Sequence, residues 1–213
     1  MKLVDLSGTL EAGMWRYPHL PQVEITQVTG IEEYGSEAHV FRFATISGTY
    51  LETAAHLLHD QPTIDQIPAE RLICEAVVLR VKKEPAQAIA VSDLERAAGG
   101  VDIRPGDALL LDTGWERMWN APNFVEDSPY LTMEAMRWIA GRKISILGGN
   151  MPCFDNPRGG AGVNGVLFKS GALILAPLVN LAAVTQPRVT LMAFPLKIKG
   201  VCGAPCRVIV REG

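Results

Sequence analysis

The amino-acid sequence predicts a mixed fold, α/β or α+β, that contains more strand than helix. Short runs of β-branched and aliphatic residues recur along the chain, and two further segments begin with helix-capping residues. Between them, 20 Gly and 14 Pro are spread without a period. Because Gly and Pro mark turns, this distribution indicates many tight connections rather than a linker or a low-complexity segment.

Eight of the apolar runs predict strands. They are short and bounded by turn residues, and they cover residues 23–28, 39–46, 76–81, 108–112, 144–147, 173–175, 189–195 and 207–211. The run at 108–112 follows an Arg-Pro-Gly-Asp turn and begins with four apolar residues. A run of this kind predicts a strand that is buried on both faces.

Three helices are expected between these strands. Ser92 is the predicted N-cap of the first, with a glutamate three residues later as in a capping box. Thr132 is the predicted N-cap of the second, which covers 133–141. The third is shorter and covers 166–169, after Asn164.

Length and charge exclude several classes of protein. A chain of 213 residues is expected to form one domain over 1–213. Its formal net charge is −3 and its longest basic cluster is the pair at 82–83, which argues against nucleic acid or an anionic membrane as a partner. No apolar run reaches the ~18 residues of a membrane span, and Asp5 interrupts any signal peptide, so a cytoplasmic protein is expected.

The four cysteines are too sparse to predict a disulfide framework. Cys202 and Cys206 are close in sequence, but no second pair completes a tetrahedral zinc site. The expectation is reduced thiols near a C-terminal strand.

Several short motifs, in one order along the chain, resemble the cyclase family that includes bacterial kynurenine formamidase (arylformamidase) and isatin hydrolase. The matching segments are Asp5-Leu-Ser7, Leu10-Glu11, Gly13-Met14, Tyr17-Pro18, Thr113-Gly-Trp115, Leu147-Gly-Gly-Asn150, Cys153-Phe-Asp155-Asn-Pro157 and Gly203-Ala-Pro205 with Arg207. The resemblance implies a swivelling β/β/α domain with a mixed β core flanked by helices, assembled as a homodimer or homotetramer. It also implies metal-dependent hydrolysis of an amide, formamide or lactam such as N-formylkynurenine, an arylformamidase step of tryptophan catabolism.

The family's metal-binding signature is altered in this chain. Where the family has H-x-G-T-H-x-D-x-P-x-H, the sequence reads Ile46-Ser-Gly48-Thr49-Tyr50-Leu-Glu52-Thr-Ala54-Ala-His56. By resemblance, positions 46, 50 and 52 bind zinc or manganese together with two downstream positions, which here hold Asn164 and Ala176. Only Glu52 is still a strong ligand, so the two-metal site is expected to be lost and no cofactor is expected.

Three hypotheses remain open for this site. In the first, an enzyme works without metal: Glu52 is the general base or anchor, His56 the general acid/base, and Tyr50 and Asn164 donate hydrogen bonds to an oxyanion. Substrate-binding candidates accompany them, namely Trp15, Thr49, Trp115 and Asp155. The structural alternative for this hypothesis is that Ile46 and Tyr50 fill the former metal cavity and Glu52 pairs with a nearby arginine.

The second hypothesis is a single re-sited metal held by Glu52, His56 and His59, with Cys153 or Asp155 approaching from a loop. The third is a non-catalytic paralogue that binds a small molecule or serves as a structural subunit. The sequence therefore predicts a diverged cyclase-family hydrolase or cyclase-like enzyme that acts on a small cyclic or aromatic amide or lactone, with the non-catalytic paralogue as the alternative.

Overall fold

The computed structural model describes residues 1–213 and is built on a closed, mixed β-sheet. The sheet order is β1-β12-β11-β5-β7-β9-β10-β4, and a further pairing of β12 with β4 closes seven strands into a barrel with β1 at its edge. These strands are β1 (Lys2–Asp5), β4 (Tyr50–Glu52), β5 (Ile73–Arg80), β7 (Ala108–Asp112), β9 (Ile146–Gly149), β10 (Leu173–Ala176), β11 (Arg188–Pro195) and β12 (Gly203–Glu212). The mixed α/β class expected from the sequence is confirmed.

Strand β7 lies inside the sheet and runs parallel to β5 and β9. All five of its residues are buried, as predicted for this run. Leu109 and Leu111 belong to the apolar core that includes the helices, whereas Ala108 and Leu110 belong to a second apolar core inside the barrel. Successive side chains of a strand point to opposite faces, so one short strand joins both cores.

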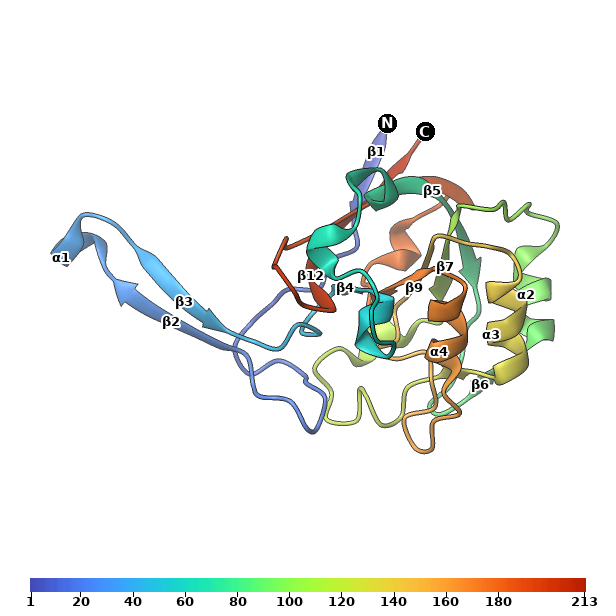
Figure 1. Ribbon diagram of the computed structural model, residues 1–213, viewed down its shortest axis with the longest axis horizontal. Helices are drawn as coiled ribbons and strands as arrows, with labels where there is room; N and C mark the ends of the chain where they lie inside the picture. The colour runs from blue at the N-terminus through green and yellow to red at the C-terminus, as the bar shows by residue number, and fades with distance from the viewer.

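Helices α2 (Val91–Ala98), α3 (Met133–Ala140) and α4 (Val163–Lys169) cover one side of the barrel (Figure 1). The predicted cap of α3 is confirmed, because Thr132 Oγ1 accepts a hydrogen bond from the Ala135 amide. The predicted cap of α2 at Ser92 is wrong. That helix begins at Val91 with Ala90 as its N-cap, two residues before the predicted cap, and its first turn is held by Asp93 Oδ2, which accepts from the Ala90 amide.

The third helix also begins earlier than predicted. It starts at Val163, so Asn164 lies in its first turn rather than before it. This placement is set by the preceding loop, whose backbone amides at 161, 162 and 163 donate to the Asp155 carboxylate. Asp155 therefore fixes the start of α4 and the position of Asn164.

A two-stranded arm projects from the barrel, as Figure 1 shows at the left. It consists of β2 (Glu24–Thr29), the short helix α1 (Ile31–Tyr34) and β3 (Ala38–Arg42). Its strands pair only with each other. Large apolar side chains are exposed along it, namely Ile25, Val28, Ile31, Tyr34, Val40 and Phe41.

All eight predicted strands are present, with shifted ends in most cases, and four short strands were not predicted. These four are β1, β4, β6 (Ala88–Ile89) and β8 (Tyr130–Leu131), each of two to four residues. Runs this short carry little periodicity, so they are defined by their partners in the sheet. No helix is long and apolar enough to cross a membrane.

Candidate active site

The altered signature motif folds as a strand followed by a turn. Tyr50 and Glu52 lie on β4, where Glu52 pairs with Ile174 of β10 on one side and with Gly203 of β12 on the other. Residues 54–56 then form a single 3-10 turn, which has Thr53 as its N-cap and ends at His56. Glu52 and His56 are thus brought together by a strand end and a turn rather than by one helical turn.

A cavity of about 140 Å³ opens at this point of the barrel. Its walls come from the N-terminal segment, β4, the turn after it, the loop after β9, α4 and β10, and its lining residues are Tyr17, His19, Ile46, Tyr50, Glu52, His56, Pro152, Cys153, Phe154, Asn164 and Ile174. All four catalytic candidates from the sequence therefore meet in one place. A larger hollow of about 480 Å³ near Ser7 and Arg207 is more open and contains neither Glu52 nor His56.

Glu52 and His56 form a close pair on the cavity wall. Glu52 Oε1 lies 3.0 Å from His56 Nδ1, and the side chains are 5% and 35% exposed. Burial raises the pKa of Glu52 to about 8 and lowers the pKa of His56 below its ordinary value, because desolvation disfavours the charged form of each group. The contact uses Nδ1, which leaves Nε2 of the imidazole free of protein partners.

Two phenols close the other side of the cavity. Tyr17 Oη donates to the Pro152 carbonyl at 2.6 Å, and Tyr50 Oη lies 3.1 Å from the same carbonyl and 2.9 Å from Tyr17 Oη. Burial raises the pKa of both phenols well above the ordinary value. Because both protons point at protein oxygens, Tyr50 must turn away from Pro152 before it can donate to a substrate.

Asn164 lines the cavity and has an unpaired side-chain oxygen. Its Nδ2 lies 4.0 Å from Cys153 Sγ, and its Oδ1 is buried without any hydrogen-bond partner. A buried acceptor without a donor costs free energy, which is a feature more common at functional sites than elsewhere in a protein. In this arrangement Asn164 offers an acceptor, whereas the sequence reading gave it a donor role. Burial also raises the pKa of the neighbouring Cys153 thiol to about 11, which keeps it protonated.

The inherited two-metal ligand set does not fit a metal. Ile46 and Ala176 have no donor atom, and the Tyr50 hydroxyl is engaged with Tyr17 and Pro152. A different group of donors does converge: one ligand atom each from Glu52, His56 and Cys202 lies within 4.8 Å of the others. The protein therefore contains a group that can bind metal, but Cys202 replaces the His59 that the sequence suggested. His59 is exposed and lies outside the cavity.

The four substrate-binding candidates do not line the cavity. Thr49 is buried and donates to the Pro177 carbonyl, Trp115 is fully buried with its indole N–H on the Phe124 carbonyl, and Asp155 holds the loop before α4. Trp15 packs edge-on against Tyr17 and Trp119. Trp15 and Asp155 thus support residues of the cavity wall, whereas Thr49 lines the larger hollow near Ser7. Motif matching alone does not distinguish such positions from contact with a ligand.

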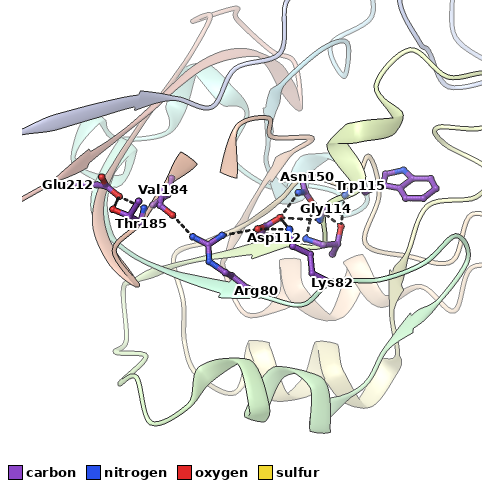
Figure 2. A network of polar contacts seen from close by, with 10 residues as sticks. Arg80, Lys82, Asp112, Gly114, Trp115, Asn150, Val184, Thr185 and Glu212 are labelled. Atoms are coloured by element: carbon purple, nitrogen blue, oxygen red, sulfur yellow. Dashed lines mark hydrogen bonds and ion pairs between the residues drawn. The ribbon is translucent and has the colours of Figure 1, made fainter. Parts of the chain in front are cut away.

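The motif residues that follow β7 and β9 build a second polar cluster, shown in Figure 2. The buried Asp112 carboxylate lies 2.9 Å from both Arg80 and Lys82 and accepts from Asn150 Nδ2 at 3.0 Å and from the Gly114 amide at 3.0 Å. This cluster ties three strand ends together and lies apart from the cavity lining. The motif residues Thr113, Gly114 and Asn150 therefore have a structural role in this cluster.

The protein is a closed β-barrel with a cavity at the end of β4. The chain belongs to the Putative cyclase family, whose model matches residues 4–156. It is 26% identical to the isatin hydrolase of Roseibium aggregatum over 217 residues, which covers 89% of this chain and 81% of that protein. It is also 26% identical to the kynurenine formamidase of Erythrobacter litoralis over 217 residues, covering 99% and 94%.

Solved structures share the fold. An isatin hydrolase A from Labrenzia aggregata bound to benzyl benzoate aligns with a TM-score of 0.88 at 22% identity, over 98% of this chain and 93% of that one. A protein described as a potential metal-dependent hydrolase with cyclase activity aligns with a TM-score of 0.81 at 23% identity, over 100% and 99%. At these identities the structures support the fold, and the resemblance found in the sequence is confirmed.

Proposed function

We propose that this protein is a hydrolase that cleaves the C–N bond of a small cyclic or aromatic amide without the two-metal site of its family. The observation that carries the proposal is the Glu52–His56 pair, which lines a cavity together with Asn164. The curated relatives, named isatin hydrolase and kynurenine formamidase, support amide-type substrates.

The proposed reaction uses His56 as the base and Glu52 as its positioning residue. In this reaction Nδ1–H donates to the Glu52 carboxyl oxygen at 3.0 Å, which leaves the lone pair on Nε2. Nε2 then accepts a proton from water as the water oxygen bonds to the amide carbonyl carbon. His56 then returns that proton to the nitrogen as the C–N bond breaks. The products are a carboxylic acid and an amine, and no other reactant is needed.

The cavity limits the size of the substrate. Its volume of about 140 Å³ is comparable to a cavity of ~150 Å³ that holds one benzene ring in another protein. One ring therefore fills the space. Asn164 also lines this space.

The test is turnover by the purified protein on a panel of single-ring lactams, aryl formamides and the matching lactones. Hydrolysis of an amide substrate, lost by about 10²-fold or more in His56→Ala with an unchanged melting temperature, is the expected result. His59→Ala is the matched control, because this exposed histidine is three residues away and outside the cavity. Full activity in folded His56→Ala would refute the mechanism, and saturable ligand binding without turnover would favour a non-catalytic paralogue.

We also propose that the chain forms a homodimer or homotetramer through the β2–β3 arm. An isolated two-stranded ribbon is marginally stable in water, and this one exposes six large apolar side chains, among them Val40 and Phe41. Sedimentation of the double variant Val40→Ser, Phe41→Ser should show a smaller species than the parent protein. An unchanged mass would contradict a role for the arm.

Four unpaired thiols support a reducing, cytoplasmic location.

A further inference from the structure

Three potential metal ligands from separate parts of the chain meet beside the cavity. Glu52 is at the end of β4, His56 ends the 3-10 turn, and Cys202 directly precedes β12. Strand pairing brings them together, because Gly203 lies opposite Glu52 and the Thr53 amide donates to the Cys202 carbonyl at 2.8 Å. The cluster is therefore held by the barrel itself.

The distances from the imidazole nitrogen to the other two donor atoms are close to those of a tetrahedral zinc site. Zn–S bonds of about 2.3 Å and Zn–N or Zn–O bonds of about 2.1 Å in a tetrahedron place sulfur about 3.6 Å from nitrogen and nitrogen about 3.4 Å from oxygen. Cys202 Sγ lies 3.6 Å from His56 Nδ1, and Glu52 Oε1 lies 3.0 Å from the same nitrogen. Only a small rotation of the Glu52 carboxyl group is needed to complete the geometry.

The same geometry argues against a nucleophilic triad of cysteine, histidine and glutamate. Such a triad needs the thiol on one ring nitrogen and the carboxylate on the other, so that the imidazole passes a proton between them. Here the sulfur and the carboxylate oxygen both approach Nδ1. Convergence of three donors on one point is the arrangement of a coordination site.

The sulfur, nitrogen and oxygen donor atoms of these three residues indicate which metal the site would bind. One thiolate, one imidazole and one carboxylate form a mixed soft and hard set that suits Zn²⁺ and is unsuited to Mg²⁺ or Ca²⁺, which take oxygen ligands. Glu52 and His56 both line the cavity. Three protein ligands would leave a fourth position open for water or another small ligand.

We propose that Glu52, His56 and Cys202 form a single-zinc site that is distinct in its ligands from the two-metal set of the family. The thiol loses its proton on binding, and the zinc ion replaces the contact between Glu52 and His56. This site goes beyond the proposed hydrolysis and does not depend on it, although the two share Glu52 and His56. Cys202 belongs to the metal site alone.

The test is titration of the chelator-treated, reduced full-length protein with Co²⁺, which replaces Zn²⁺ in tetrahedral sites and reports its ligands by absorbance. One equivalent should produce a near-ultraviolet band of sulfur-to-cobalt charge transfer together with intense visible bands, and Zn²⁺ should remove them. Cys202→Ser should abolish the charge-transfer band and weaken zinc binding by about 100-fold or more, at or above the loss typical of changes around metal ligands.

Cys206→Ser is the matched control, because this cysteine is four residues further along β12 and outside the cluster. It should keep the complete spectrum. A charge-transfer band that survives in Cys202→Ser, or the absence of any tetrahedral spectrum in the parent protein, would overturn the proposal. Because this readout is spectroscopic, a protein that binds zinc but hydrolyses nothing would refute the proposed function and leave the metal site intact.

Discussion

Two buried carboxylates, Asp112 and Glu52, lie in opposite kinds of surroundings. Asp112 is completely buried and receives two cationic side chains, one side-chain amide and one backbone amide (Figure 2). Glu52 is almost as buried, yet its only polar neighbours within bonding distance are His56 and, slightly farther away, the Cys202 thiol. Asp112 therefore has four donors, whereas Glu52 has neither a lysine or arginine nor an amide beside it.

This difference separates a structural group from a functional one. A buried charge is stable when every lone pair is matched by a donor, and the Asp112 cluster meets that condition at the ends of β5, β7 and β9. Burial without such donors raises the pKa of Glu52 to about 8. A perturbed carboxyl group beside a histidine and a cavity is typical of a functional site, where stability is given up for chemistry or ligand binding.

The largest expected effect is a loss of stability on substitution of Asp112. Asp112→Asn removes the charge opposite Arg80 and Lys82 and turns one acceptor into a donor that faces other donors. We expect a loss of about 3 kcal/mol in the free energy of unfolding, measured by urea denaturation. The control is Asp102→Asn, because the Asp102 side chain is 71% exposed in its pair with Arg104 and should matter little. Equal stability of the two variants would contradict the structural role of Asp112.

The same chemical change at Glu52 should have the opposite outcome. Glu52→Gln keeps the shape of the side chain and removes a carboxyl group that has no cationic side chain or amide beside it, so the stability of the protein should stay within about 1 kcal/mol of the parent or rise. Hydrolysis should fall about 10-fold or more, because a glutamine amide can still accept from Nδ1–H but cannot ionise to stabilise the positive charge on His56 after it takes a proton. A variant that loses 3 kcal/mol of stability and keeps its activity would make Glu52 a structural residue.

Zinc binding gives a third test of the functional role of Glu52. If the ion binds Glu52 and His56, it occupies the pair that the proposed hydrolysis uses, and turnover should fall about 10-fold when the site is filled. The melting temperature should rise at the same time, because a ligand that binds only the folded state stabilises it. Chelator should reverse both effects. Turnover that increases with zinc would leave the metal site standing and refute His56 as the base.

The sequence was sufficient for the framework and for part of the site. Strand β7 was predicted with its correct ends, because four consecutive buried aliphatic residues after a turn leave few alternatives. Tyr50, Glu52, His56 and Asn164 were found through aligned motif positions, and the cavity does bring them together.

The parts that were missed depend on long-range contacts. Cys202 joins the cluster only through the pairing of β12 with β4, and the signal that could have found it is its position directly before the matched Gly203-Ala-Pro205 segment. Trp15 and Trp115 have the composition of a ligand pocket, but local sequence does not reveal that they pack behind the wall. His59 has the spacing of a ligand, yet the turn directs it to solvent.

The smallest expected effect concerns a third carboxylate, Glu212, which resembles Asp112 in having many donors. It accepts from the backbone amides of Thr185 and Gln186 and pairs with Lys2. These contacts lower the pKa of Glu212 to about 2 from its ordinary value of 4.5. The folded protein therefore holds this proton less tightly than the unfolded chain, so the stabilising contribution is complete above about pH 4.5 and is lost as the pH falls towards 2. Denaturation curves of Glu212→Gln and the parent protein should converge over that acidic range and differ above it. A constant difference between the two at every pH would show that the hydrogen bonds of Glu212 do not depend on its charge.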